Sequence, residues 1–333
     1  MKHKLHNIYI VLLAIALLSS CKTSFEYPGD DPVDPTLVNL ELSVDIDFSE
    51  VLYYEPYYKS SSEATTYLSR TMIEVYKSSD LTTPLFRDTH YSPFSVDGTV
   101  DIDVIYQVNA IEYTVAIWSD IVEEGSKEDL FFTTELLSSI KNIEPYSGNS
   151  DLKNSFSDLI EVDLREYRDM WNITHHCDAT MERPLARYEI WTNDLLLFVS
   201  EQSKSSPQET VDITTYDVEL SYDGYMPFGY DVFSDTPNEA RQSISYTSKI
   251  EILSDSTARI GFDHIFVNHT ETKVNVSIVV YNSSGEVITG VEGITIPLLR
   301  DMNTIIIDDY LTRDYNPGIG IDPSFEGDIN ITI

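Results

Sequence analysis

The stretch from Leu37 to Phe48 reads LVNLELSVDIDF. From Leu40 onward every second residue is apolar, and the residues between them are polar or acidic. Because successive side chains of a strand point to opposite faces, this period of two predicts a β-strand with one buried and one solvated face. Such a strand must bury its apolar face against another layer of the fold.

Upstream of this strand, the sequence has the parts of a secretory signal. A short basic region precedes an apolar run over residues 8–18, which is shorter than the roughly 20 residues that cross a bilayer. The motif Leu18-Ser19-Ser20-Cys21 follows and resembles the bacterial lipobox, in which the cysteine is lipidated and becomes the mature N-terminus. An ordinary signal peptide with a chance cysteine is the alternative. We expect residues 1–20 to be a lipoprotein signal peptide and the acyl chains on Cys21 to hold the protein to the outer membrane, exposed at the cell surface.

Residues 21–36 are expected to form a flexible tether, because several prolines and a glycine prevent regular structure there. The chain as a whole has 42% hydrophobic residues, which is the composition of a packed protein and not of a disordered acidic segment. The formal charge of −35 argues against nucleic acid as a partner, because a strongly acidic chain repels other polyanions. Once Cys21 is acylated, Cys177 has no cysteine with which to form an intramolecular disulfide, so stability must come from packed cores.

The rest of the chain is predicted to consist of many short strands. The segment from Ile111 to Trp118 is apolar on both faces, which is typical of a central strand. Leu130 to Ile143 fits a strand and a short helix equally well, and Gly229 to Ala240 is expected to be irregular. Further strands are expected at residues 67–76, 100–106, 183–192, 211–222, 243–253 paired with 257–267, 272–281, 303–308 and 329–333. Helical periodicity is nearly absent, so the pattern favours sandwiches.

Four stretches in the second half share a family pattern. They are residues 183–188, 261–267, 296–312 and 322–328. They resemble the fimbrillin-like and fimbrial anchor lipoproteins of Bacteroidales. The resemblance implies an all-β fold of two tandem transthyretin-like, Greek-key β-sandwiches, which we expect at residues 37–175 and 176–333. One departure is Arg300-Asp301, where the family usually has Arg-Asn.

The resemblance also implies a non-catalytic surface role. Family members are fimbrial stalk subunits, anchors, tips or single surface lipoproteins, whose partners are fimbrial subunits joined by strand addition or surface ligands of host or bacterial cells. Stalk subunits are trimmed by an arginine-specific protease in the loop after their first strand. Here residues 49–66 contain no arginine, and Lys59 is their only basic residue. An anchor, accessory or adhesive role is therefore favoured over a stalk, and a glycan-binding lipoprotein of a polysaccharide-uptake system is the alternative.

A cluster of tyrosines in the loop after the first strand is a candidate contact surface. It comprises Tyr53, Tyr54, Tyr57 and Tyr58. Exposed aromatic rings stack on sugars or anchor protein partners, whereas tyrosines at strand ends commonly pack their rings and expose only their hydroxyls. We favour the structural interpretation.

His175-His176-Cys177-Asp178 is the cluster with the residue types of a metal site. On a strand, His175 and Cys177 share one face and His176 lies on the other, so a closed site needs further ligands from elsewhere. We expect no metal and no cofactor. The sequence has no Gly-x-Ser-x-Gly motif and no glycine-rich phosphate loop, so we expect no enzymatic activity.

Overall fold

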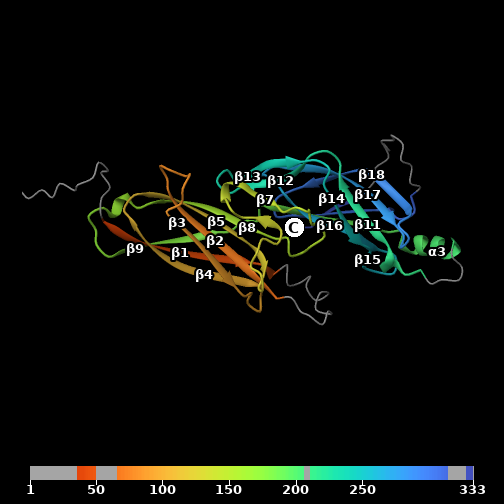
Figure 1. The fold of residues 1–333 in the computed structure, drawn as a ribbon, viewed down its shortest axis with the longest axis horizontal. Coiled ribbons are helices and arrows are strands. Elements are labelled where there is room, and N and C mark those ends of the chain that lie inside the picture. Colours follow the sequence, from red (N-terminus) through yellow and green to blue (C-terminus); the bar gives the residue numbers. More distant parts are fainter. Residues whose placement is uncertain (1–35, 50–65, 206–210, 314–327, 333) are drawn as a thin grey trace, which may run out of the picture. The chain divides into compact units, whose positions relative to one another are not determined.

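The computed structural model describes residues 36–49, 66–205, 211–313 and 328–332 (Figure 1). Over these residues the chain is almost entirely β-structure, arranged as two β-sandwiches in tandem. The expected all-β class is confirmed. The predicted signal segment, most of the predicted tether and the tyrosine cluster lie outside the described residues.

The first sandwich consists of a three-stranded and a four-stranded sheet, in the orders β4-β1-β9 and β3-β2-β5-β8. The strands are β1 (Leu37–Asp47), β2 (Tyr67–Lys77), β3 (Phe86–Ser92), β4 (Thr99–Asn109), β5 (Glu112–Glu123), β8 (Phe156–Asp163) and β9 (Ile173–Thr180). Alternate residues of β1 are buried, as its sequence predicts, and they pack against apolar residues of β2, β5 and β8. This packing between the two sheets forms the first core.

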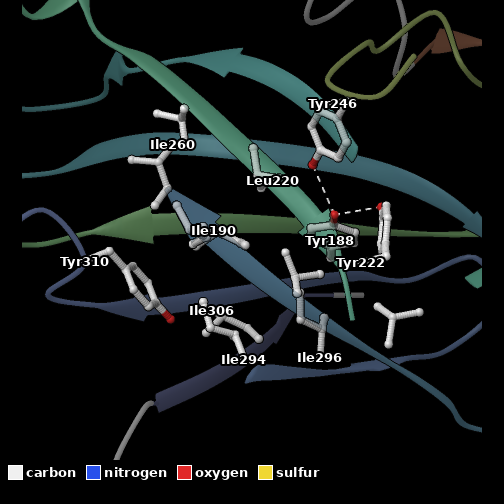
Figure 2. Packing of buried hydrophobic residues seen from close by; sticks show 14 of the residues in the cluster. Tyr188, Ile190, Leu220, Tyr222, Tyr246, Ile260, Ile294, Ile296, Ile306 and Tyr310 are labelled. Carbon is white, nitrogen blue, oxygen red and sulfur yellow. Dashed lines mark hydrogen bonds between the residues drawn. The ribbon is translucent and has the colours of Figure 1, made fainter. Parts of the chain in front are cut away.

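The second sandwich combines a five-stranded sheet, β15-β16-β10-β19-β20, with a four-stranded sheet, β14-β11-β17-β18. The strands are β10 (Leu185–Thr192), β11 (Asp217–Tyr222), β14 (Ser245–Lys249), β15 (Glu251–Ile252), β16 (Ala258–Phe266), β17 (Thr272–Tyr281), β18 (Val287–Leu298), β19 (Asn303–Asp308) and β20 (Asp328–Thr332). Figure 2 shows part of its core, where aliphatic residues pack beside the tyrosines Tyr188, Tyr222, Tyr246 and Tyr310. The Tyr188 hydroxyl hydrogen-bonds those of Tyr222 at 2.8 Å and Tyr246 at 3.0 Å, so these polar groups have partners inside the core.

A small sheet, in the order β13-β12-β7-β6, joins segments from both halves of the chain. Its strands are β6 (Phe132–Thr133), β7 (Ile140–Asn142), β12 (Met226–Asp231) and β13 (Thr236–Arg241), and η2 (Leu137–Ser139) lies between β6 and β7. It contributes Phe132 and Tyr230 to a third core with Trp118 of β5. This explains why β5 is apolar on both faces: Trp118 faces the third core, whereas Tyr113 faces the first.

Several elements differ from the sequence-based expectations. The ambiguous segment from Leu130 to Ile143 contains both short strands and a 3-10 turn, and the expectation of irregular structure from Gly229 to Ala240 was wrong, because β12 and β13 pair there. Of the expected pair 243–253 and 257–267, β15 alone pairs with β16, whereas β14 joins β11 in the opposite sheet.

Other elements carried no clear signal. The edge strand β3 is polar. In the helix α3 (Leu195–Ser205), Leu196 and Leu197 are exposed although they are apolar, so the sequence does not show which face of the helix is buried. The 3-10 turns η3 (Arg165–Tyr167) and η4 (Ile213–Thr215) are each a single turn. Asp301 has a φ of 57°, in the left-handed region that Asn and Asp adopt more readily than most residues.

Candidate interaction surfaces

The first strand of each sandwich is a central strand. All eleven residues of β1 pair with the antiparallel β4, and all eight residues of β9 pair with β1 in parallel. The expected domain boundary between residues 175 and 176 lies inside β9. In the second sandwich, β10 pairs in the same way with the antiparallel β16 and the parallel β19, and β20 then covers the outer edge of β19.

The first arginine after β1 is not accessible. Arg70 lies within β2, and its guanidinium donates to both carboxylate oxygens of Asp120, at 2.8 and 2.6 Å. It also pairs with Asp129 at 2.6 Å. The Arg70 and Asp120 side chains are only 6% and 2% exposed. An arginine-specific protease would therefore have to unfold β2 to cleave the peptide bond after Arg70.

The strand β9 carries the residues considered as metal ligands. His175 and Cys177 are half-buried on the side that faces the first core, whereas His176 is exposed on the opposite face, as the alternation predicts. The His175 Nδ1 lies 3.1 Å from the Tyr167 hydroxyl, and His176 pairs with Glu41 at 2.9 Å. Burial, together with Asp178, raises the pKa of the Cys177 thiol, which disfavours the thiolate that binds metals. Among the described residues, no group of three His, Cys, Asp or Glu is placed to hold a metal ion.

The outer face of the sheet β4-β1-β9 is acidic. Asp45 of β1 stands directly opposite Asp101 of β4, and Asp103 and Asp178 lie near it. A hydrogen bond with Asp101, slight burial and repulsion from these carboxylates raise the pKa of Asp45. Like charges facing one another across strands oppose further strand pairing, so this face and its edges discourage association.

A loop from the first half of the chain docks onto the second sandwich. The Lys153 ammonium lies 3.0 Å from the Asp263 carboxylate of β16, and their side chains are 1% and 0% exposed. The hydroxyls of Tyr146 and Tyr222 donate to the same carboxylate at 2.5 and 2.6 Å. Burial lowers the pKa of Lys153, and the attraction of Asp263 opposes that shift. Each buried charge therefore has an opposite charge beside it and tyrosine hydroxyls as hydrogen-bond partners.

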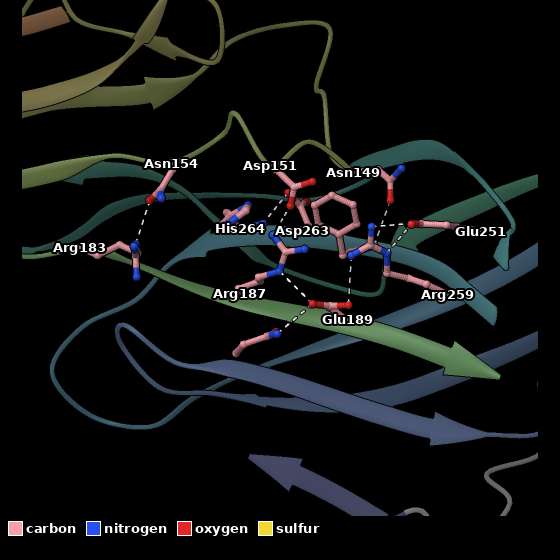
Figure 3. Close-up of polar contacts among 12 residues, drawn as sticks. Asn149, Asp151, Asn154, Arg183, Arg187, Glu189, Glu251, Arg259, Asp263 and His264 are labelled. Atoms are coloured by element: carbon pink, nitrogen blue, oxygen red, sulfur yellow. Dashed lines mark hydrogen bonds and ion pairs between the residues drawn. The ribbon is translucent and has the colours of Figure 1, made fainter. Parts of the chain in front are cut away.

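Beside this pair, a second group of charges extends across β10 and β16 (Figure 3). Arg187 donates to Asp151 of the docked loop at 2.5 Å and to Glu189 at 3.1 Å. Arg259 pairs with Glu189 at 3.2 Å and with Glu251. Burial alone would raise the pKa of the Glu189 carboxyl, but Arg187, a hydrogen bond from Trp191, Arg259 and a hydrogen bond from Asn303 together hold that pKa below its ordinary value. The pair of Arg187 with Asp151 joins the loop to the second sandwich, and the other pairs connect strands within that sandwich.

The loop from η3 to β9 lies at the end of the first sandwich where the described chain begins. The Asp169 amide donates to the Thr36 hydroxyl at 3.0 Å, and the Met170 amide donates to the Tyr167 carbonyl at 3.0 Å. Asp169 and Asn172 adopt φ angles of 63° and 58° on either side of Met170 and Trp171. The backbone of the loop is thus fixed against the start of β1.

Residues 32–333 match the model of a family of unknown function, DUF6562. The chain belongs to this family. No curated protein matches the sequence. The family match covers both sandwiches and begins just before β1.

Solved structures similar to the chain include the fimbrial anchor protein Mfa2 from Porphyromonas gingivalis, at 10% identity and a TM-score of 0.44, covering 81% of this chain and 90% of that one. A candidate polysaccharide-binding protein from Bacteroides thetaiotaomicron has 9% identity and a TM-score of 0.43, and the match covers 83% of this chain and 93% of that one. A candidate cell adhesion protein from Bacteroides eggerthii has 9% identity and a TM-score of 0.43, covering 91% and 97%. A fimbrial anchor is among them, as the sequence resemblance led us to expect.

Two of these features, a buried ion pair and an exposed tryptophan, had no clear sequence signal. Lys153 and Asp263 are 110 residues apart, and nothing in either segment indicates that they pair. Asp169 and Asn172 lie on either side of Met170 and Trp171, which indicates a turn but does not indicate that Trp171 is exposed. Cys21 and the tyrosines of the loop after β1 lie outside the described residues, so their roles stay predictions. No described helix is long and apolar enough to span a bilayer.

Proposed function

We propose that this chain is a non-catalytic lipoprotein of the outer membrane that acts at the cell surface as a fimbrial anchor or accessory subunit, or as an adhesive component, and not as a polymerising stalk subunit. The observation that carries the second part is the placement of β1. It is the central strand of its sheet, paired along its whole length with β4 and flanked by β9. A subunit that keeps this strand has no open groove for a strand from a neighbour.

The sequence that follows β1 supports the same proposal. Removal of β1 requires cleavage in the segment that follows it, and residues 49–66 contain no arginine. Arg70, the next one, is buried in an ion pair with Asp120. We therefore propose a mature chain that begins at lipidated Cys21, continues through a tether to Thr36 and retains both sandwiches as domains.

The proposal is tested on protein isolated from cells that produce it naturally. Mass mapping of the N-terminus is expected to find acylated Cys21, and electron microscopy of the same preparation is expected to show no filaments composed of this chain. A Cys21→Ala variant, the matched control, is expected to leave the membrane pellet, because acylation supplies the anchor. Mature termini between Ser49 and Arg70, together with filaments that contain this chain, would establish a stalk subunit instead.

A further inference from the structure

The loop from η3 to β9 exposes two neighbouring apolar side chains. Trp171 is 77% exposed and Met170 is 47% exposed, and Leu37 at the start of β1 is 44% exposed at the same end of the sandwich. Single exposed apolar residues are common on protein surfaces. Here, however, the loop backbone is held by hydrogen bonds to Thr36 and Tyr167 while its largest side chain points to solvent. The fold therefore fixes Trp171 in an exposed position.

This loop lies beside Thr36, the residue at which the predicted tether joins the first sandwich. The predicted anchor, Cys21, is separated from Thr36 by a short segment, and Thr36 accepts the hydrogen bond from the loop. The 15 residues numbered 21–35 span at most about 50 Å when fully extended, and a flexible coil of that length averages about 20 Å. With the proposed anchor at Cys21, this length limits the start of β1 to within about 50 Å of the bilayer.

The charge of the loop is unlike that of the whole chain. The chain has a formal charge of −35, whereas residues 165–172 contain two arginines, Arg165 and Arg168, and two carboxylates, Glu166 and Asp169. Arg165 pairs with Glu112 and Asp163 outside this segment, but η3 and the loop together have no net charge and are less repelled by phosphate head groups than the strongly acidic chain as a whole. Trp residues, moreover, favour the boundary between head groups and acyl chains, where the ring is apolar and the indole N–H stays hydrated.

We propose that the Met170-Trp171 loop is a membrane-contact site that places Trp171 at the head-group level of a phospholipid surface. The inference rests on the proposed lipid anchor at Cys21. One tryptophan and one methionine bind a bilayer weakly by themselves, but a tether of this length makes the contact intramolecular and raises its effective concentration. The contact orients the first sandwich with the start of β1 toward the membrane, so that the second sandwich is presented outward.

The test supplies the anchor chemically, so that it does not depend on lipidation in cells. The mature chain beginning at Cys21, with Cys177→Ser, is coupled through the Cys21 thiol to a maleimide lipid in phosphatidylcholine vesicles. Brominated phosphatidylcholine then quenches tryptophans that contact the bilayer. The chain has three tryptophans: Trp118 is fully buried, Trp171 is exposed and Trp191 is half-buried in the second sandwich.

We expect brominated lipid to reduce the emission of the coupled protein. This loss should disappear in Trp171→Phe and persist in Trp191→Phe, the matched control. Equal quenching in the unsubstituted protein and in Trp171→Phe, including no quenching in either, would overturn the bilayer as the occupant of this site and leave a protein partner or water. Failure of lipidation at Cys21 in cells would instead contradict the proposed function, and it is measured separately by the N-terminal mapping.

Discussion

In the first sandwich β1 lies between the antiparallel β4 and the parallel β9, and in the second β10 lies between the antiparallel β16 and the parallel β19. Outside this shared arrangement the two differ. The second adds β15 and β20 to its sheet, whereas the outer edges of β4 and β9 carry no further strand among the described residues. The same strand arrangement is thus completed in two different ways.

The difference indicates how each sheet avoids pairing with other chains. The second sandwich covers the edge of β19 with β20. The first leaves its edges open but lines their outer face with Asp101, Asp103, His176 and Asp178. Charged residues on exposed edges oppose the addition of a foreign strand. The first sandwich therefore relies on charge where the second relies on an additional strand, and neither arrangement requires a strand from a neighbouring subunit.

The largest loss of stability is expected from breaking the buried pair of Lys153 and Asp263, where the loop docks onto the second sandwich. Asp263→Ala leaves the Lys153 ammonium buried without its counter-charge and is expected to reduce the free energy of unfolding by about 3–5 kcal/mol. Denaturant unfolding measures this change. Asp217→Ala is the matched control in the same sandwich, because Asp217 pairs with Lys249 at the surface and such pairs contribute at most about 1 kcal/mol. If both variants lost equal stability, the buried pair of Lys153 and Asp263 would not be what holds the loop on the second sandwich.

A smaller loss of unfolding free energy is expected from a glycine substitution in one turn of each sandwich. Gly98 has a φ of 85°, and an added Cβ would lie 2.6 Å from the Ser49 Cα, against the end of β1. Gly285, in the β17–β18 turn, has a φ of 77° with open space around it. Gly98→Ala should therefore cost about 2–4 kcal/mol, and Gly285→Ala only the left-handed strain of about 1–2 kcal/mol. Equal losses in denaturant unfolding would show that β1 is not held tightly by the turn beside it.

The sequence was sufficient to predict the strands whose hydrophobic pattern is visible within the strand itself. The alternation of β1 and the doubly apolar β5 were both visible, because burial on one or two faces leaves a direct pattern. The small sheet was not predictable, since β7 and β12 are short and come from distant segments. The pairing of Lys153 with Asp263 was equally hidden, because a buried ion pair depends on tertiary contacts and not on spacing.

The central claim is that β1 is a permanent central strand of the first sandwich, as β10 is of the second. Hydrogen–deuterium exchange of the mature protein compares the two directly, because amides in a central strand exchange only when the sheet opens. Peptides covering Leu37–Asp47 are expected to be as strongly protected as peptides covering Leu185–Thr192. Rapid exchange along β1 while β10 stays protected would show a strand poised for release, and would contradict the account.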